Sequence, residues 1–156
     1  MTIPETVVDH LVVATEEVFE TMVFRPIVRG AQLDGDAVRP PSNVVATVAF
    51  AGHRRGLVAF HSSLDAAREI AGSMLGMEPN AVNGEMPDAI GEIANMIAGA
   101  FRTKLAAVEP ASAIAVPTVT IGSDFSTRYG NAVKRVLCPF EMDAQTLYVE
   151  LILNGE

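Results

Sequence analysis

Hydrophobic residues recur at three- and four-residue intervals in three stretches of the chain, which predicts three amphipathic helices. Pro26 should end the first helix, because proline cannot continue the hydrogen-bond ladder. The second follows Ser63, a good capping residue, and stops at Gly76. The third begins at Pro87, which suits a first helical turn. The three predicted helices cover about residues 5–24, 64–75 and 87–108.

Apolar runs rich in Val and Phe, separated by turn residues, predict the strands. Residues 25–42 are rich in Pro and Gly and predict a loop, with at most one short strand around Ile27–Leu33. The element order is therefore α-β-β-α-α-β-β-β. This is an α/β protein of the α+β type, with three main helices packed on a mostly antiparallel sheet. The predicted strands are residues 43–51, 54–61, 117–121, 131–140 and 146–153.

Length and composition favour one folded domain over residues 1–156, since 49% of the residues are hydrophobic and 19% are charged. The net charge of −8 argues against nucleic acid or anionic lipid as the main partner. One cysteine, Cys138, excludes a disulfide within the chain. No apolar run approaches the ~20 residues of a membrane span, and no secretory signal is visible. We therefore expect a cytoplasmic protein without a membrane span.

The third predicted helix carries a polar stripe opposite its apolar face. With ~100° per residue, five residues fall within about 40° of Asp88 on the helical wheel. These are Asp88, Glu92, Asn95, Gly99 and Arg102. The apolar residues of the same helix cluster on the other side: Ile90, Ile93, Ala94, Ile97, Phe101 and Val108. One face should pack on the sheet while the other faces solvent.

A polar stripe is typical of any surface helix, and acidic residues near its start are favoured by the helix dipole. Two residues do not fit that simple interpretation. Asn95 is a poor residue for a helix interior, and Gly99 costs about 1 kcal/mol relative to alanine there. A glycine lets another surface approach the backbone, and a carboxamide offers both a donor and an acceptor. The stripe therefore also fits a partner-binding face.

Chemically, Asn95 cannot be a general base because it does not titrate, but a carboxamide can orient a water for attack on phosphorus. The sequence has no Gly-rich phosphate loop, and its histidines have no metal-ligand spacing to one another or to Cys138. A water-orienting helix would thus need a partner that brings both the metal and the phosphoryl group.

The stretch from Asp88 through Glu92 to Asn95 matches the Asp-x-x-x-Glu-x-x-Asn signature of the CheC/CheX chemotaxis phosphatases. Residues 67–76 also resemble that family, and Pro117 lies one residue nearer to Asn95 than the proline of the signature. Two-site CheC proteins carry a second Glu-x-x-Asn in the first helix, where this chain has the sequence Glu-Glu-Val-Phe at residues 16–19. The chain therefore resembles the single-site, CheX-like branch.

The resemblance implies a CheC-like fold and a phosphatase that hydrolyses the aspartyl phosphate of a CheY-type response regulator. Asn95 would orient the attacking water, and Glu92 would dock a lysine of the regulator. Asp88 would be a supporting acid at the edge of the site, and Gly99 would leave room for the partner. The protein would need no cofactor of its own, since the Mg²⁺ belongs to the receiver domain. It would form a homodimer with one site per subunit.

Two other functions stay open at this stage. The same face could grip a receiver domain as a non-catalytic adaptor, or the chain could be an interaction module resembling flagellar switch components. Elsewhere, residues 53–55 predict a solvated hairpin tip. Lys134 and Arg135 predict an outward side chain and an edge-protecting charge. His61 predicts a boundary residue rather than a catalytic base, and Cys138 a small core residue.

Overall fold

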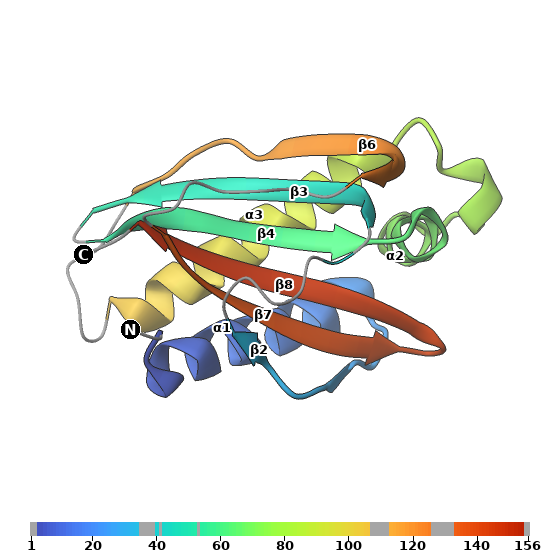
Figure 1. Ribbon diagram of the computed structural model, residues 1–156. Helices are drawn as coiled ribbons and strands as arrows, with labels where there is room; N and C mark the ends of the chain where they lie inside the picture. The colour runs from blue at the N-terminus through green and yellow to red at the C-terminus, as the bar shows by residue number, and fades with distance from the viewer. Residues whose placement is uncertain are drawn as a thin grey trace.

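The computed structural model describes residues 3–34, 40, 42–52, 54–106, 113–125 and 133–154. Three α-helices and a large sheet make up the fold (Figure 1). The helical elements are α1 (Glu5–Val18), a π-helical turn (Phe19–Val23), α2 (Leu64–Leu75), a 3₁₀ turn (Pro79–Ala81) and α3 (Met86–Leu105). The strands are β1 (Val28–Arg29), β2 (Leu33–Asp34), β3 (Ser42–Ala51), β4 (Arg55–Ser62), β5 (Ala113–Ile114), β6 (Thr118–Phe125), β7 (Val133–Met142) and β8 (Gln145–Asn154).

The strands form one sheet in the order β1-β7-β8-β4-β3-β5, with β2 also on β7 and β6 also on β3. Every strand pair in the described part of the chain is antiparallel. The β7–β8 hairpin turns on Asp143 and Ala144 between the paired residues Met142 and Gln145. Asp143 has φ 54°, the left-handed conformation that tight hairpin turns require. The predicted fold class is confirmed.

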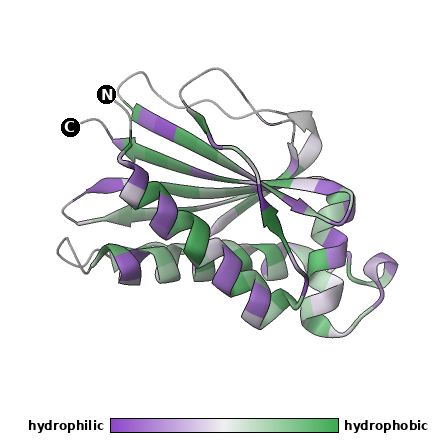
Figure 2. Ribbon diagram, turned by 90° about the horizontal axis from the view of Figure 1, so that it is seen from below, coloured by the Kyte–Doolittle hydropathy of each residue, from purple (hydrophilic) through white to green (hydrophobic). Residues whose placement is uncertain are grey.

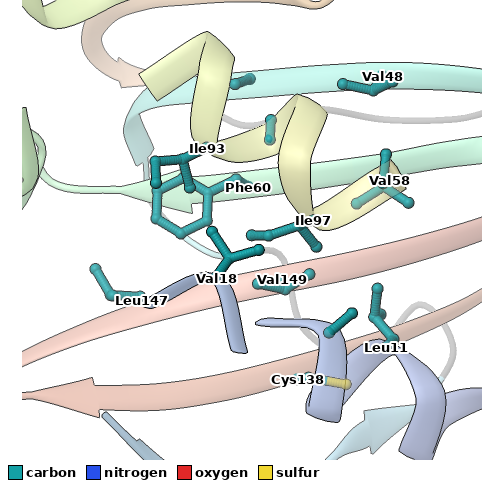
Figure 3. Packing of buried hydrophobic residues seen from close by; sticks show 14 of the residues in the cluster. Leu11, Val18, Val48, Val58, Phe60, Ile93, Ile97, Cys138, Leu147 and Val149 are labelled. Atoms are coloured by element: carbon teal, nitrogen blue, oxygen red, sulfur yellow. The ribbon is translucent and has the colours of Figure 1, made fainter. Parts of the chain in front are cut away.

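The helices cover one face of the sheet, and the core lies between the two layers. Along β8 the residues Leu147, Val149 and Leu151 alternate toward the helices and are buried. Figure 3 shows Leu147 and Val149 among the side chains that gather with Ile93 and Ile97 of α3 between the helices and the sheet. In a view from below, hydrophilic positions recur along the helices between hydrophobic ones, which is the pattern of helices half in the core (Figure 2).

The predicted ends of the second helix are confirmed. The Ser63 hydroxyl accepts a hydrogen bond from the backbone N–H of Ala66 (3.1 Å), and Gly76 ends the helix with φ 65°. The first helix also ends before Pro26 as predicted. Its last turn widens into a π-helix, and Phe24 closes it with φ 60°. The third helix ends at Leu105, before the predicted end at about Val108. Val108 itself and His53 of the predicted hairpin tip lie outside the described residues.

Three short strands correct the predicted element order. Residues 25–42 hold two strands, β1 and β2, where at most one was expected, and both pair with β7. Strand β5 precedes β6 and pairs with β3. Each is two residues long, which is too short for a hydrophobic alternation to reveal. These strands exist because a long neighbouring strand offers them backbone partners.

The sheet face opposite the helices holds a buried ionic network, which overturns the predictions for Arg135 and His61. Glu150 is fully buried, and its Oε2 accepts a hydrogen bond from Nε of Arg135 (2.5 Å). Its Oε1 lies 3.0 Å from Nε2 of His61, whose Nδ1 lies 3.1 Å from Oγ of Ser42. Arg135 is therefore an internal ion-pair partner and not an edge charge. His61 is a buried member of this network and not a boundary residue.

Removing the shared carboxylate should destabilise the fold strongly. We expect Glu150→Ala to lower the free energy of unfolding by about 3 kcal/mol or more, because it takes away the anion that both Arg135 and His61 contact inside the sheet layer. Urea unfolding followed by circular dichroism measures this. The exposed Glu20→Ala is the matched control and should leave stability nearly unchanged. Equal stability of the two variants would show that the network contributes little.

Candidate functional site

The rotation of α3 about its axis decides which side chains face solvent. Ile90, Ile93 and Ile97 are fully buried and Phe101 nearly so, with the Phe101 ring edge-on to Phe50 of β3. This apolar face has a strong hydrophobic reason to stay against the sheet. The other side of the helix is consequently fixed outward, as the helical periodicity predicts.

The predicted polar stripe lies on that outward side, and we call its residues the α3 outer row: Asp88, Glu92, Asn95, Gly99 and Arg102. Asp88 and Glu92 are exposed, while Asn95, Gly99 and Arg102 are half-buried. Asp88 stands in the first turn of the helix, where the dipole favours an acid. The sequence prediction therefore placed all five residues on one accessible face.

Glu92 and Asn95 are three residues apart, so their side chains lie next to each other on the helix surface. In the described part of the chain, neither makes a hydrogen bond or an ion pair, and Asp88 makes none either. A carboxylate and a carboxamide thus lie side by side on the helix surface, the carboxylate exposed and the carboxamide half-buried. Such a pair can bind a cation and orient a water or hydroxyl on an incoming partner.

Two glycines of α3 have opposite surroundings. A Cβ on Gly99 would have nothing within 4 Å, so this position leaves open space over the outer row. A Cβ on Gly91 would lie 3.2 Å from Cγ2 of Val119 and 3.6 Å from Cγ of Pro117. Gly91 therefore lets the start of β6 approach the helix one residue before Glu92. Sequence reasoning missed this role, although a glycine inside a helical pattern is a signal of close packing.

The outer row is an open helix face and not a small-molecule pocket. Two grooves in the described part of the chain lie elsewhere, beside the end of α1 at Phe24 and Ile27 and beside α2 at Arg68. No group of His, Cys, Asp and Glu side chains suited to a metal occurs among the described residues. An open polar helix face suits a protein partner.

Arg25 carries a pKa shift, and it lies outside the outer row. Its guanidinium bonds Asp143 of the β7–β8 turn, and this hydrogen bond raises the pKa of Arg25. The same guanidinium lies 3.6 Å from Glu69 of α2. The cation joins the end of the first helical segment to α2 and to the hairpin turn, which is a structural role.

The first helix does not repeat the pair found on α3. Phe19 stands where a second Glu-x-x-Asn would place its carboxamide, and it is only 1% exposed. Its ring packs 6.1 Å from that of Phe60, centroid to centroid. The side of α1 at Glu16 therefore offers no amide to a partner.

Comparison with known proteins shows the family of the chain that carries this face. The family model described as chemotaxis phosphatase CheX matches residues 44–141, which include the outer row and Pro117. The chain belongs to the CheX family. This confirms the resemblance seen in the Asp88–Asn95 signature. A search of curated protein sequences gives no significant match.

Solved structures place the fold in the same group. The chemotaxis protein CheX of Vibrio vulnificus superposes with a TM-score of 0.87 at 23% identity, over 96% of this chain and 99% of that one. The CheX–CheY–BeF3–Mg²⁺ complex of Borrelia burgdorferi gives 0.82 at 19% identity, covering 95% and 97%. FliY of Thermotoga maritima gives 0.69 at 17%, covering 98% and 92%. CheX-family chains and a flagellar protein thus share this architecture.

No described helix combines the length and the apolar character that crossing a membrane would need.

The two glycines make a matched pair for testing the packing of α3. We expect Gly99→Ala to raise the free energy of unfolding by about 0.5–1 kcal/mol, because alanine is the better helix former and meets no neighbour. Gly91→Ala should be at least about 1 kcal/mol less stable than Gly99→Ala, because its methyl presses on Val119. Thermal or urea unfolding of both variants measures the difference. Equal gains in the two would show that β6 does not need the glycine.

Proposed function

We propose that this CheX-family protein hydrolyses the aspartyl phosphate of a phosphorylated CheY-type receiver domain at the α3 outer row. The observation that carries the proposal is a Glu92–Asn95 pair, side by side on an outward helix face and without a hydrogen-bond or ion-pair partner among the described residues, in a chain of a phosphatase family. In this account Asn95 orients the attacking water and Glu92 docks the receiver. Asp88 supports the edge of the site, and Gly99 leaves room for the partner's backbone.

The chemistry assigned to Asn95 is positioning. Its carboxamide oxygen accepts a hydrogen bond from a water and turns the oxygen lone pair of that water toward phosphorus. A bond forms between the water oxygen and phosphorus while the phosphorus–oxygen bond to the receiver aspartate breaks. The aspartate leaves as a carboxylate, and the water protons leave with inorganic phosphate and the solvent. Asn95 accepts no proton, so this step needs no titrating residue on α3.

Glu92 supplies the binding part of the mechanism. A carboxylate on an open helix face can form a charge-assisted hydrogen bond with a lysine of the receiver. Because Glu92 has no partner among the described residues, this bond needs no internal ion pair to break first. The position of the lysine then sets where Asn95 enters the receiver.

The metal in this account belongs to the receiver. The Borrelia burgdorferi complex contains CheX, CheY, BeF3 and Mg²⁺, which supports assembly of such a site between two proteins of these kinds. We also propose that this chain is a single domain over residues 1–156 and forms a homodimer with one outer row per subunit. Sedimentation velocity tests that assembly.

A second candidate function has support from the fold. FliY of Thermotoga maritima and the FliM middle domain of Vibrio alginolyticus have similar structures, with TM-scores of 0.69 and 0.66. The chain could therefore bind a receiver as a non-catalytic adaptor, or assemble as a flagellar-switch-like module. An adaptor would function without Asn95, and a switch module would form large rings without any receiver.

Replacing the carboxamide tests the catalytic role. We expect Asn95→Ala to lower the rate constant for receiver dephosphorylation by about 100-fold or more, since loss of one well-placed hydrogen-bonding group typically costs 10²–10³. Binding to the receiver should persist. Release of radiolabelled phosphate under single-turnover conditions measures the rate. Glu16→Ala on α1 is the control and should act as wild type. Undiminished activity of Asn95→Ala would remove the catalytic assignment.

Replacing the carboxylate tests docking separately. Glu92→Ala should raise KM for the phosphorylated receiver by about tenfold or more with a smaller effect on kcat, because a hydrogen bond to a charged group contributes about 1.5–3 kcal/mol. Steady-state phosphate release over a range of receiver concentrations separates the two constants. A fall in kcat at unchanged KM would instead place Glu92 in the chemical step.

A further inference from the structure

We infer that the receiver-docking surface extends from the α3 outer row onto a β-bulge formed by Val116 and Pro117, which presents Val116 as an apolar contact for the receiver. This inference rests on the proposed function, because it names the receiver as the occupant. It concerns recognition and adds no catalytic group.

The bulge follows from the strand register. Ile114 of β5 lies opposite Phe50 of β3, and Thr118 of β6 lies opposite Thr47. Three residues of the outer strand therefore face two residues of β3. The N–H of Ala115 donates to the carbonyl of Ala49 (2.8 Å), which leaves Val116 and Pro117 together against Val48. Two residues against one is a β-bulge, a device common at sheet edges and beside functional sites.

The bulge is held in place at both ends. Ala115 is bonded to β3 before it, and the β3–β6 ladder resumes at Thr118 after it. Pro117 has a fixed φ, and a residue that precedes proline is confined to extended conformations. Val116 is consequently displayed in a preformed geometry, so a partner that binds it does not have to order a loop.

The bulge packs against α3 at Gly91, in the part of the helix that carries the outer row. Pro117 Cγ is 3.6 Å from the point where Gly91 would carry a Cβ. Gly91 follows Asp88 by three residues and precedes Asn95 by four, so it lies between them on one side of the helix. Val116 is therefore the sequence neighbour of Pro117, which packs against α3 at Gly91, beside the α3 outer row.

Val116 is the most exposed large hydrophobic side chain in the described part of the chain, at 85%. A single exposed apolar residue is ordinary, and the argument depends on its place. The outer row is polar and open to water, whereas a protein interface holds its polar contacts best where apolar neighbours exclude solvent. We therefore expect Val116 to contact an apolar side chain of the receiver that borders its phosphorylated aspartate.

A matched pair of valines gives the test. Val28 of β1 is 67% exposed and lies on the opposite edge of the sheet from β6, so Val28→Ser is the control for Val116→Ser. The probe is a purified CheY-type receiver, used in two forms. The phosphorylated form gives KM and kcat from phosphate release, and the form loaded with BeF3 and Mg²⁺ gives Kd by titration calorimetry.

We expect Val116→Ser to raise both KM and Kd by about 5–10-fold, because the complex loses one buried aliphatic contact. The kcat should stay within about twofold of wild type. Val28→Ser should match wild type. Equal constants for the two variants would overturn the inference. A change of sedimentation coefficient in Val116→Ser would also overturn it, because Val116 would then be a contact between copies of this chain.

The two assays separate this inference from the proposed function. Wild type that binds the loaded receiver but does not hydrolyse the phosphorylated one would refute the phosphatase proposal, and a Kd effect of Val116→Ser would still support the docking surface. Wild type that binds no CheY-type receiver would overturn the inference itself. Circular dichroism of both variants checks that the serine substitutions leave the fold intact.

Discussion

The burial of one side of α3 determines the arrangement of the whole candidate site. Ile90, Ile93 and Ile97 lie in the core between the helices and the sheet, and no rotation of the helix keeps them buried without turning Glu92 and Asn95 outward. The hydrophobic effect thus orients two polar groups that form no hydrogen bond or ion pair within the described part of the chain. An open and preformed pair of side chains is what a protein needs when the reacting group arrives on another protein.

The edge of the sheet also determines the surroundings of the α3 outer row. Gly91 lets β6 come close to α3 just where the outer row begins, and the bulge at Pro117 shapes that edge. The distance between helix and edge strand is set by a missing side chain rather than by a bond. The candidate site therefore lies on a helix whose position is determined by core packing and by the close approach of β6.

Local signals sufficed to predict the parts of the fold that local chemistry determines. Ser63 and Gly76 mark α2 because capping and the left-handed turn act within a few residues. The periodicity of α3 predicts its exposed row for the same reason. The bonds from Glu150 to His61 and Arg135 could not be predicted, because the three residues lie on three different strands. His61 and Glu150 are 89 residues apart in the sequence. The packing of Pro117 against Gly91 is also a contact between residues far apart in the sequence. The two-residue strands are too short to show a hydrophobic periodicity.

A crystal structure of this protein bound to a CheY-type receiver loaded with BeF3 and Mg²⁺ would examine the mechanism at the reacting atoms. The account predicts the Asn95 carboxamide inside the receiver's phosphorylation site, within about 3.2 Å of the beryllium fluoride or of a water in line with it. Glu92 should meet a lysine of the receiver in the same complex. A receiver seated on another face, with Asn95 still in solvent, would contradict the assignment of α3 as the catalytic helix.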